Sequence, residues 1–173
     1  MTLSSNAPNK AVFLDRDGVI NDPGNCYYVW KETQLRINPG VVETLKALSE
    51  RGYLLIVITN QGGVGRGLYT RKDVDAFHDC LRRELEAEGV WIGEIYTCPH
   101  HSCSGKCLCR KPQPLMIQKA LARFRIDPDH SWMVGDSQRD VEAGKAAGLR
   151  TLQVESNGDL RGILDRILDH GEG

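Results

Sequence analysis

Five short apolar runs, separated by segments with helical periodicity, constrain the fold of this chain more than any other feature. They are Ala11 to Leu14, Tyr53 to Ile58, Ile95 to Thr97, Trp132 to Val134 and Thr151 to Val154. The first two are almost wholly apolar, as are strands that are covered on both faces of a parallel sheet. Strands that alternate with helices predict an α/β fold built on a doubly wound parallel sheet.

The segments between these runs carry start signals for helices. Asn38 is a candidate N-cap for a helix with Pro39 in its first turn. Thr70 and Asp73 resemble a capping box that opens a second helix. Helical spacing predicts further helices over residues 115–124, 141–147 and 160–168. The sequence therefore predicts a Rossmann-like sheet with helices on both faces.

The length of the chain limits the number of domains. Its 173 residues suffice for one compact α/β domain and leave little room for a second. We therefore expect a single domain over residues 1–173, without a large cap domain. The connections 18–37 and 98–114 are long and follow predicted strands, so both are expected at the carboxyl edge of the sheet, where α/β sheets bind ligands.

Charge and hydropathy exclude several classes of partner. The net charge is −1 and the charged residues are mixed along the chain, so no basic strip is available for nucleic acid or an anionic membrane. No apolar stretch approaches the ~20 residues that span a bilayer, and the polar start Met1 to Lys10 lacks the apolar segment of a signal peptide. We expect a monomeric cytoplasmic protein whose partner is a small molecule.

Two carboxylates follow the first apolar run, in a predicted turn. Asp15 and Asp17 stand two residues apart and are followed by Gly18. A carboxylate that attacks phosphorus splits hydrolysis into two displacements, and a neighbouring carboxyl group can protonate the leaving alkoxide and then activate water. Asp15 and Asp17 suit these roles. A solvated turn or a calcium loop is the alternative for this motif alone.

Three further positions carry polar groups that suit phosphate chemistry. Thr59 follows the second run and can donate its hydroxyl proton to a phosphate oxygen. Lys111 follows Arg110 after the long connection and can neutralise a transferring phosphoryl group. Asp136 follows the fourth run and can complete an oxygen-rich magnesium site. Considered singly, each has a structural alternative: a buried hydroxyl, a solvated basic pair or a helix N-cap.

Four of the six cysteines crowd into one loop together with two histidines. The loop contains Cys98, His100, His101, Cys103, Cys107 and Cys109. These soft ligands exceed what a tetrahedral zinc site needs, and a site with four protein ligands is closed and structural. In a cytosolic protein such crowding favours a metal over disulfides, and clustered free thiols would be prone to oxidation. We expect a zinc-binding loop at about residues 98–109.

The motifs that contain Asp15, Thr59, Lys111 and Asp136 together resemble those of the haloacid dehalogenase superfamily of phosphotransferases. Their order and their positions at predicted strand ends match, and the resemblance spans residues 12–148. It implies a phosphatase that forms an aspartyl-phosphate. A phosphotransferase or phosphomutase would usually need an added cap domain to exclude water, and no segment here is long enough to be one.

The resemblance also implies a role for each residue. Asp15 is the nucleophile, Asp17 the general acid and base, and Thr59 and Lys111 bind the phosphate. A catalytic Mg²⁺ is implied, held by Asp15, the backbone carbonyl of Asp17 and Asp136. The alternative of another class is a non-catalytic phosphate-binding module organised by zinc, and the intact set of residues argues against it.

The cysteine-rich loop narrows the resemblance to one branch of the superfamily. Cys-x-His followed by Cys-x-Cys-Arg-Lys-Pro is similar to the zinc-containing branch of histidinol phosphatases and heptose bisphosphate phosphatases. The ligands implied by this similarity are Cys98, His100, Cys107 and Cys109. Cys103 and His101 are additional to that pattern, so exchange of a ligand within the loop stays open.

The string Asn60 to Gly67 separates the two activities of this branch. It resembles the corresponding string of the D-glycero-D-manno-heptose 1,7-bisphosphate 7-phosphatases more than that of the histidinol phosphatases. The resemblance implies hydrolysis of the C7 phosphate while the C1 phosphate is held elsewhere. Asn60 is expected to bind substrate, and Arg110 is the candidate for the retained phosphate because a guanidinium can form a two-pronged contact. Histidinol phosphate is the alternative substrate.

Overall fold

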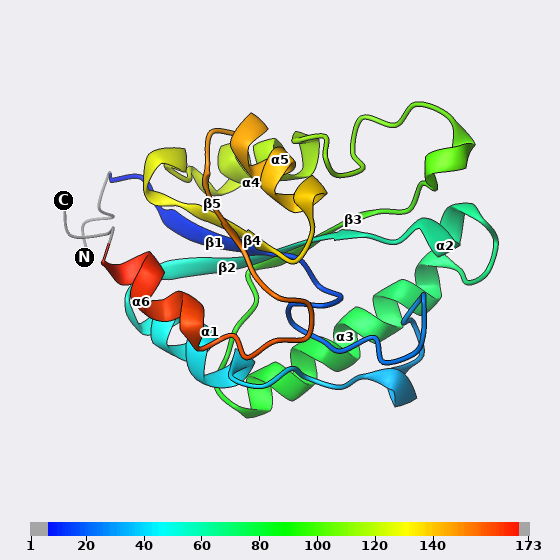
Figure 1. The fold of residues 1–173 in the computed structure, drawn as a ribbon, viewed down its shortest axis with the longest axis horizontal. Coiled ribbons are helices and arrows are strands. Elements are labelled where there is room, and N and C mark those ends of the chain that lie inside the picture. The colour runs from blue at the N-terminus through cyan, green and yellow to red at the C-terminus, as the bar shows by residue number, and fades with distance from the viewer. Residues whose placement is uncertain (1–6, 170–173) are drawn as a thin grey trace, which may run out of the picture.

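Five parallel strands form one sheet at the centre of the computed structural model, which describes residues 7–169 (Figure 1). They are β1 (Lys10–Leu14), β2 (Tyr53–Asn60), β3 (Glu94–Cys98), β4 (Trp132–Gly135) and β5 (Arg150–Gln153). The strand order is β3-β2-β1-β4-β5 and every neighbouring pair is parallel. The predicted α/β fold with a doubly wound parallel sheet is confirmed.

Six helices are described. They are α1 (Val41–Glu50), α2 (Gly62–Gly65), α3 (Arg71–Ala87), α4 (Leu115–Phe124), α5 (Gln138–Ala146) and α6 (Gly162–Leu168). Short 3-10 turns lie at η1 (Glu32–Gln34), η2 (Ser102–Ser104) and η3 (Pro128–His130). Helices α1, α3 and α6 pack on one face, and α4 and α5 pack on the other (Figure 1).

The alternation of side chains along β1 explains why two cores form. Val12 and Leu14 point into the core shared with α1, α3 and α6, whereas Ala11 and Phe13 point into the core shared with α4 and α5. All four side chains are fully buried. Because successive residues of a strand face opposite sides, an unbroken apolar run is needed to bury both faces.

The predicted start of α1 is wrong. The helix begins at Val41, and its N-cap is Gly40, whose φ of 73° is left-handed and whose position carries no side-chain cap. Asn38 is buried and its Nδ2 donates to the carbonyl of Val19 at 3.1 Å. Asn38 therefore ties the connection 18–37 to α1, and Pro39 lies before the helix.

Other boundaries differ by a few residues. The capping box of Thr70 and Asp73 is present at the start of α3. Helix α5 starts earlier than expected because Ser137 and Asp140 form a second capping box. Helix α6 starts at Gly162 and not at residue 160, β2 continues to Asn60, and the short α2 was not predicted.

The strand order creates a crevice beside β1. The connection after β1 leads to β2 on one side, and the connection after its other neighbour β4 leads to β5 on the opposite side, so the two diverge from the carboxyl ends of adjacent strands. Ligands of open α/β sheets bind at such a switch point. The connections 18–37 and 98–114 follow β1 and β3 at this edge (Figure 1). No helix in the described part of the chain is long and apolar enough to cross a membrane.

Candidate active site

Asp15 follows β1 directly and meets a buried lysine. The Nζ of Lys111 lies 2.7 Å from Asp15 Oδ1, 2.7 Å from Asp140 Oδ1 and 2.7 Å from the carbonyl oxygen of Ile58. The Lys111 and Asp140 side chains are almost fully buried, and that of Asp15 is 10% exposed. One ammonium group is therefore shared between two carboxylates.

The charges in this group shift its proton equilibria. Burial raises the pKa of Asp15 to about 7, against the opposing effect of the Lys111 ammonium and with a further increase from the Asp140 carboxylate. Burial alone would lower the pKa of Lys111, but the carboxylates of Asp15 and Asp140 raise it above its ordinary value. Lys111 is therefore charged at neutral pH, and a further cation beside Asp15 would favour its ionised form.

Three carboxylates converge at the carboxyl edge of the sheet. Oxygen atoms of Asp15, Asp136 and Asp140 lie within 4.8 Å of one another. Carboxylate oxygens are the ligands that Mg²⁺ prefers in proteins. The turn after β1 approaches Asp136 closely, since a Cβ added to Gly18 would lie 2.1 Å from Asp136 Oδ2. The left-handed φ of 86° at Gly18 and this contact both explain why glycine occupies the position.

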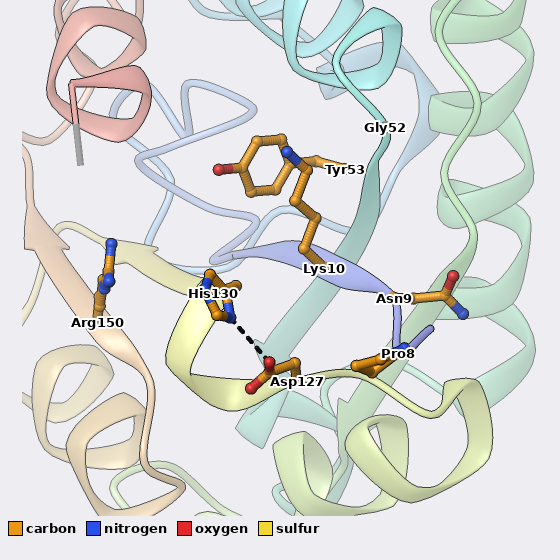
Figure 2. Close-up of a pocket in the computed structure, with 8 residues that line it drawn as sticks. All are labelled: Pro8, Asn9, Lys10, Gly52, Tyr53, Asp127, His130 and Arg150. Carbon is orange, nitrogen blue, oxygen red and sulfur yellow. Dashed lines mark hydrogen bonds and ion pairs between the residues drawn. The ribbon is translucent and has the colours of Figure 1, made fainter. Parts of the chain in front are cut away.

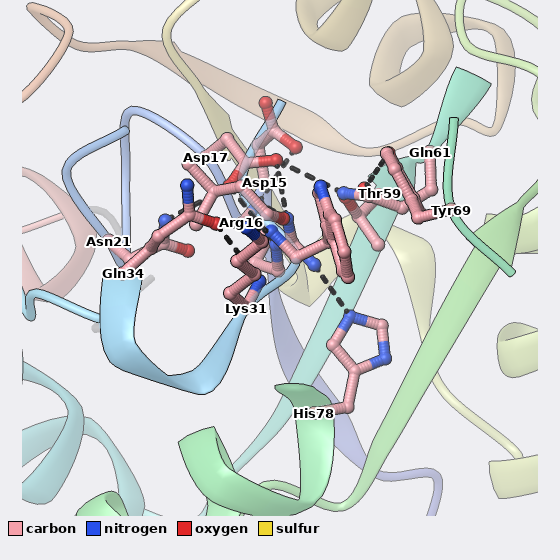
Figure 3. Close-up of polar contacts among 12 residues, drawn as sticks. Asp15, Arg16, Asp17, Asn21, Lys31, Gln34, Thr59, Gln61, Tyr69 and His78 are labelled. Carbon is pink, nitrogen blue, oxygen red and sulfur yellow. Dashed lines mark hydrogen bonds and ion pairs between the residues drawn. The ribbon is translucent and has the colours of Figure 1, made fainter. Parts of the chain in front are cut away.

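Asp17 is held by several donors (Figure 3). Arg16 donates from Nε to Oδ1 at 3.1 Å and from a terminal amine to Oδ2 at 2.9 Å. Asn21 Nδ2 donates to Oδ1 at 3.0 Å, and Gln61 Nε2 donates to Oδ2 at 3.0 Å. All of these groups donate, so together they fix the position of the Asp17 carboxyl group.

Arg16 is itself fully buried beneath Asp17. Its guanidinium lies 4.5 Å from the centre of the Phe77 ring, donates to the carbonyl of Val29 at 2.6 Å and contacts His78 Nε2 at 3.1 Å. Burial, then the charge of Arg16, lowers the pKa of His78 to about 3. His78 is therefore neutral and can accept a hydrogen bond from Arg16 (Figure 3).

The two predicted substrate-binding residues at the end of β2 have different contacts. Thr59 is buried below the cleft, and its Oγ1 accepts a hydrogen bond from Gln61 Nε2 at 2.9 Å. Asn60 forms two hydrogen bonds with the backbone of Lys111. The Nδ2 of Asn60 donates to the Lys111 carbonyl at 3.2 Å, and the Lys111 N–H donates to Oδ1 of Asn60 at 3.0 Å. Asn60 therefore joins the end of β2 to the segment that carries Lys111.

A cleft of about 170 Å³ opens above these residues. Its lining includes six residues that were predicted as site residues: Asp15, Asp17, Asn60, Arg110, Lys111 and Asp136. The rest of the lining comprises Arg139, Gln61, Gly62, Tyr27 and Tyr28. The cleft thus brings a group of carboxylates together with three basic side chains, an arrangement that suits a phosphate ester and a divalent cation.

The predicted zinc ligands also come together. One ligand atom each from Cys98, His100, Cys107 and Cys109 lies within 4.8 Å of the other three. The Nδ1 of His100 is 3.0 Å from Cys107 Sγ, and Cys98 Sγ is 3.1 Å from Cys109 Sγ. Three sulfurs and one imidazole nitrogen suit zinc.

The two additional residues of the loop lie apart from this group. His101 Nδ1 accepts a hydrogen bond from the backbone N–H of Cys103 at 3.1 Å, which caps the turn η2. Cys103 is exposed and does not belong to the group of four. The geometry therefore favours Cys98, His100, Cys107 and Cys109 over an alternative set that includes His101 or Cys103.

The cysteine-rich loop also supports the cleft. The carbonyl of His100 accepts a hydrogen bond from Arg110 at 2.9 Å. The carbonyls of Cys98 and Pro99 accept from the backbone N–H groups of Gln61 and Gly65, each at 2.8 Å. The loop thus fixes both Arg110 and the first turn after β2.

A larger cavity of about 410 Å³ lies at the opposite, amino edge of the sheet (Figure 2). Lys10 Nζ lies 4.2 Å from the centre of the Tyr53 ring, and His130 Nδ1 lies 2.8 Å from Asp127 Oδ2. The cavity contains none of the predicted site residues. Its size alone does not make it the catalytic site.

Sequence reasoning missed several residues of the site. Asp140 pairs with Lys111. It lies four residues after Asp136, in the first turn of α5, and this spacing could have indicated that it belongs to the site. Arg16 and Gln61 contact Asp17, and Arg139 lines the cleft. Gln61 and Arg139 resemble ordinary surface residues in the sequence, so no local pattern distinguishes them.

Similarity to known proteins agrees with this geometry. A family model described as HAD-hydrolase-like matches residues 108–167. The D-glycero-beta-D-manno-heptose-1,7-bisphosphate 7-phosphatase of Rhodopseudomonas palustris is 39% identical, over 96% of this chain and 94% of that protein. The D-glycero-alpha-D-manno-heptose-1,7-bisphosphate 7-phosphatase of Photorhabdus laumondii is 40% identical, over 81% of this chain and 79% of that protein.

A solved structure extends the similarity to three dimensions. The D,D-heptose 1,7-bisphosphate phosphatase of B. bronchiseptica, crystallised with magnesium and phosphate, superimposes with a TM-score of 0.79 and 33% sequence identity. The superposition covers 91% of this chain and 86% of that chain. With nearly full-length matches at this identity, the chain belongs to the D-glycero-D-manno-heptose-1,7-bisphosphate 7-phosphatase family of haloacid dehalogenase-like hydrolases.

Proposed function

We propose that this protein hydrolyses the C7 phosphate of D-glycero-D-manno-heptose 1,7-bisphosphate through an aspartyl-phosphate on Asp15. The observation that carries the proposal is the Asp15 carboxylate at the end of β1, paired with Lys111 and open to the cleft. The activity named for the relatives supports the choice of substrate.

The first step transfers the phosphoryl group to the protein. An oxygen of Asp15 attacks phosphorus, the bond to the C7 oxygen breaks, and Asp17 gives a proton to the departing alkoxide. Lys111 offsets negative charge on the transferring group, and Thr59 donates to one of its oxygens. Proton donation matters here because a sugar alkoxide is a poor leaving group.

The second step releases phosphate. Asp17, now ionised, takes a proton from a water molecule as its oxygen attacks the phosphorus of the aspartyl-phosphate. The bond between phosphorus and the Asp15 oxygen breaks, which restores the carboxylate. The donors around Asp17 hold its carboxyl oxygens in place for this step.

Mg²⁺ fits the carboxylates at the edge of the sheet. The residues that would hold it are Asp15 and Asp136, with the backbone carbonyl of Asp17, and Asp140 lies within the same group of carboxylates. When bound, the ion orients the phosphate and offsets its repulsion from Asp15. A hard oxygen donor set of this kind matches the magnesium in the crystal structure of the relative.

Zinc fits the cysteine-rich loop and has a structural role in this proposal. Cys98, His100, Cys107 and Cys109 would complete a closed tetrahedral site. The hydrogen bonds from this loop to Arg110, Gln61 and Gly65 give the metal an indirect effect on the cleft. Zinc bound there would stabilise the loop and take no part in phosphoryl transfer.

Arg110 is the proposed contact for the retained C1 phosphate. It lines the cleft beside Lys111, and one of its terminal amines is anchored on the carbonyl of His100. A guanidinium held by one amine can offer its remaining N–H groups to a phosphate. Arg139 lines the same cleft and adds positive charge. A second dianion on the substrate would therefore be attracted to this part of the cleft.

A substrate panel tests the proposal. With Mg²⁺ present, kcat/KM is measured for both anomers of heptose 1,7-bisphosphate, for heptose 7-phosphate and for histidinol phosphate. Relatives named for each anomer require that both be assayed. We expect the bisphosphates to exceed histidinol phosphate by on the order of 100-fold, because its ammonium group would face Arg110. Preference for histidinol phosphate would overturn the assignment.

A further inference from the structure

Gln61 lies between Asp17, the proposed general acid and base, and Thr59, a proposed phosphate ligand. Its side chain is buried, with the residue only 1% exposed. Its Nε2 donates to Asp17 Oδ2 at 3.0 Å and to Thr59 Oγ1 at 2.9 Å (Figure 3). A single amide group therefore connects the proton-transfer residue to the phosphate-binding hydroxyl.

The orientation of this amide is fixed by Tyr69. The hydroxyl of Tyr69 donates to Gln61 Oε1 at 2.8 Å (Figure 3). Burial raises the pKa of Tyr69 to about 12, so the hydroxyl keeps its proton at neutral pH. The reversed amide would turn Oε1 toward the ionised carboxylate that Asp17 has in the second step, so two acceptors would face each other. The observed orientation is therefore strongly preferred.

The surroundings of Tyr69 hold its ring in place. It stacks on Trp30 with ring centres 5.5 Å apart and planes inclined by 17°, and it meets the edge of Tyr28 at 5.8 Å. A Cβ added to Gly63 would lie 2.1 Å from a ring carbon of Tyr69. Helix α2 and the aromatic part of the connection 18–37 thus enclose the ring.

The contacts of the amide suit both steps of the proposed reaction. Because Thr59 accepts a hydrogen bond from Gln61, its own hydroxyl proton is left for donation to a phosphate oxygen. Because Asp17 accepts a bond from the same nitrogen, its carboxylate is held at a set position relative to Thr59. General acid catalysis requires such positioning within hydrogen-bond reach of the leaving oxygen.

We infer that Gln61, held by Tyr69, is a positioning residue that aligns Asp17 for proton transfer and orients the hydroxyl of Thr59. This inference rests on the proposed function, since it requires Asp17 to protonate the leaving group. Tyr69 acts only through Gln61. Neither residue needs to contact the reacting atoms.

Gln61→Leu tests the inference with two esters that differ in leaving group. Heptose 1,7-bisphosphate releases an alkoxide that needs a proton, whereas p-nitrophenyl phosphate releases a phenolate that does not. We expect kcat to fall on the order of 100-fold for the sugar ester and about 10-fold for the aryl ester. The smaller loss on the aryl ester reflects only the hydroxyl of Thr59, which Gln61 no longer orients. Gln118→Leu, at an exposed position of α4, is the matched control and should change either rate by less than about 2-fold.

Tyr69→Phe tests the second part of the inference and keeps the aromatic ring. We expect kcat for the sugar ester to fall about 10-fold. Adding the change to Gln61→Leu should cause no further fall, since the effects of residues that act as a unit are not additive. Tyr53→Phe removes a hydroxyl at the opposite edge of the sheet and is the control. Thermal unfolding verifies that each variant is folded, and Tyr69→Phe carries the test if Gln61→Leu does not fold.

Equal losses on the two esters in folded Gln61→Leu would overturn the inference, because a packing role affects both alike. Additive losses in the double variant would overturn the link to Tyr69. A wild-type protein that hydrolyses neither ester would overturn the proposed function itself, and the inference with it. A wild-type protein active on both, with an unchanged ratio in the variant, would overturn the inference alone.

Discussion

At the carboxyl edge of the sheet Lys111 faces Asp15 and Asp140, whereas at the amino edge Lys10 lies over the ring of Tyr53. The cleft at the carboxyl edge has a volume of about 170 Å³, less than half the 410 Å³ of the amino-edge cavity. The two regions belong to the same strands and differ chiefly in how their charges are balanced.

Carboxylates gather at the carboxyl edge. Asp15, Asp136 and Asp140 form a group that, among the described residues, has one buried ammonium beside it, so its excess of negative charge suits a divalent cation. At the amino edge Asp127 is paired with His130 on the surface. The carboxyl ends of parallel strands bring polar side chains together, and this convergence indicates the candidate active site better than cavity volume does.

The strongest test of the comparison is Asp15→Asn. The amide keeps the shape of the side chain and removes the nucleophile, so turnover of heptose 1,7-bisphosphate should fall on the order of 10³-fold or more. Steady-state kinetics measures the loss, and circular dichroism should show an intact fold. Activity near that of the wild type would exclude Asp15 as the nucleophile.

A second prediction concerns the metal proposed for the cysteine-rich loop. Cys109→Ser should reduce the zinc content, measured by elemental analysis, and lower the melting temperature by about 10 °C, because a structural metal contributes to folding. Activity should fall because less of the protein is folded and because Arg110 loses its fixed position on the loop. Wild-type protein purified without chelator that contains no zinc would refute the assignment.

Arg110→Ala should have a smaller and more selective effect. Loss of a charge-assisted contact of ~1.5 to 3 kcal/mol should lower kcat/KM for heptose 1,7-bisphosphate by about 10-fold or more. The loss should be much smaller for p-nitrophenyl phosphate, which has no second phosphate. Equal losses of kcat/KM on both substrates would show that Arg110 binds the reacting phosphate or stabilises the fold of the loop.

Substitutions at the amino edge should have the smallest effect. Lys10→Met and His130→Gln alter the charges of the larger cavity and should leave kcat/KM within about 2-fold of the wild-type value. The same assays as for Arg110→Ala provide the comparison. A loss of 10-fold or more in either variant would break the distinction between the two edges.

Much of this site could be predicted because its residues follow apolar strands directly. Asp15 and Asp136 end buried runs, so the parallel sheet alone places them at one edge. The four zinc ligands lie within twelve residues of chain, so their spacing was also informative.

The rest depends on contacts that no local pattern encodes. Arg16 and His78 meet across 62 positions of sequence, and the hydroxyl of Tyr69 reaches Gln61 where Gly63 of α2 packs against the ring. The start of α1 was mispredicted because the side chain of Asn38 donates to the carbonyl of Val19 instead of capping the helix, and left-handed Gly40 is the N-cap. Tertiary contacts thus decided the positions that sequence reasoning missed.

The proposed function requires that the ester bond at C7 breaks and that the phosphate at C1 stays attached. Wild-type protein is incubated with Mg²⁺ and heptose 1,7-bisphosphate, and the reaction is followed by phosphorus NMR. We predict that the C7 ester signal disappears as inorganic phosphate appears in equal amount, while the C1 phosphate signal persists. Loss of the C1 phosphate, or release of neither phosphate, would contradict the proposed function.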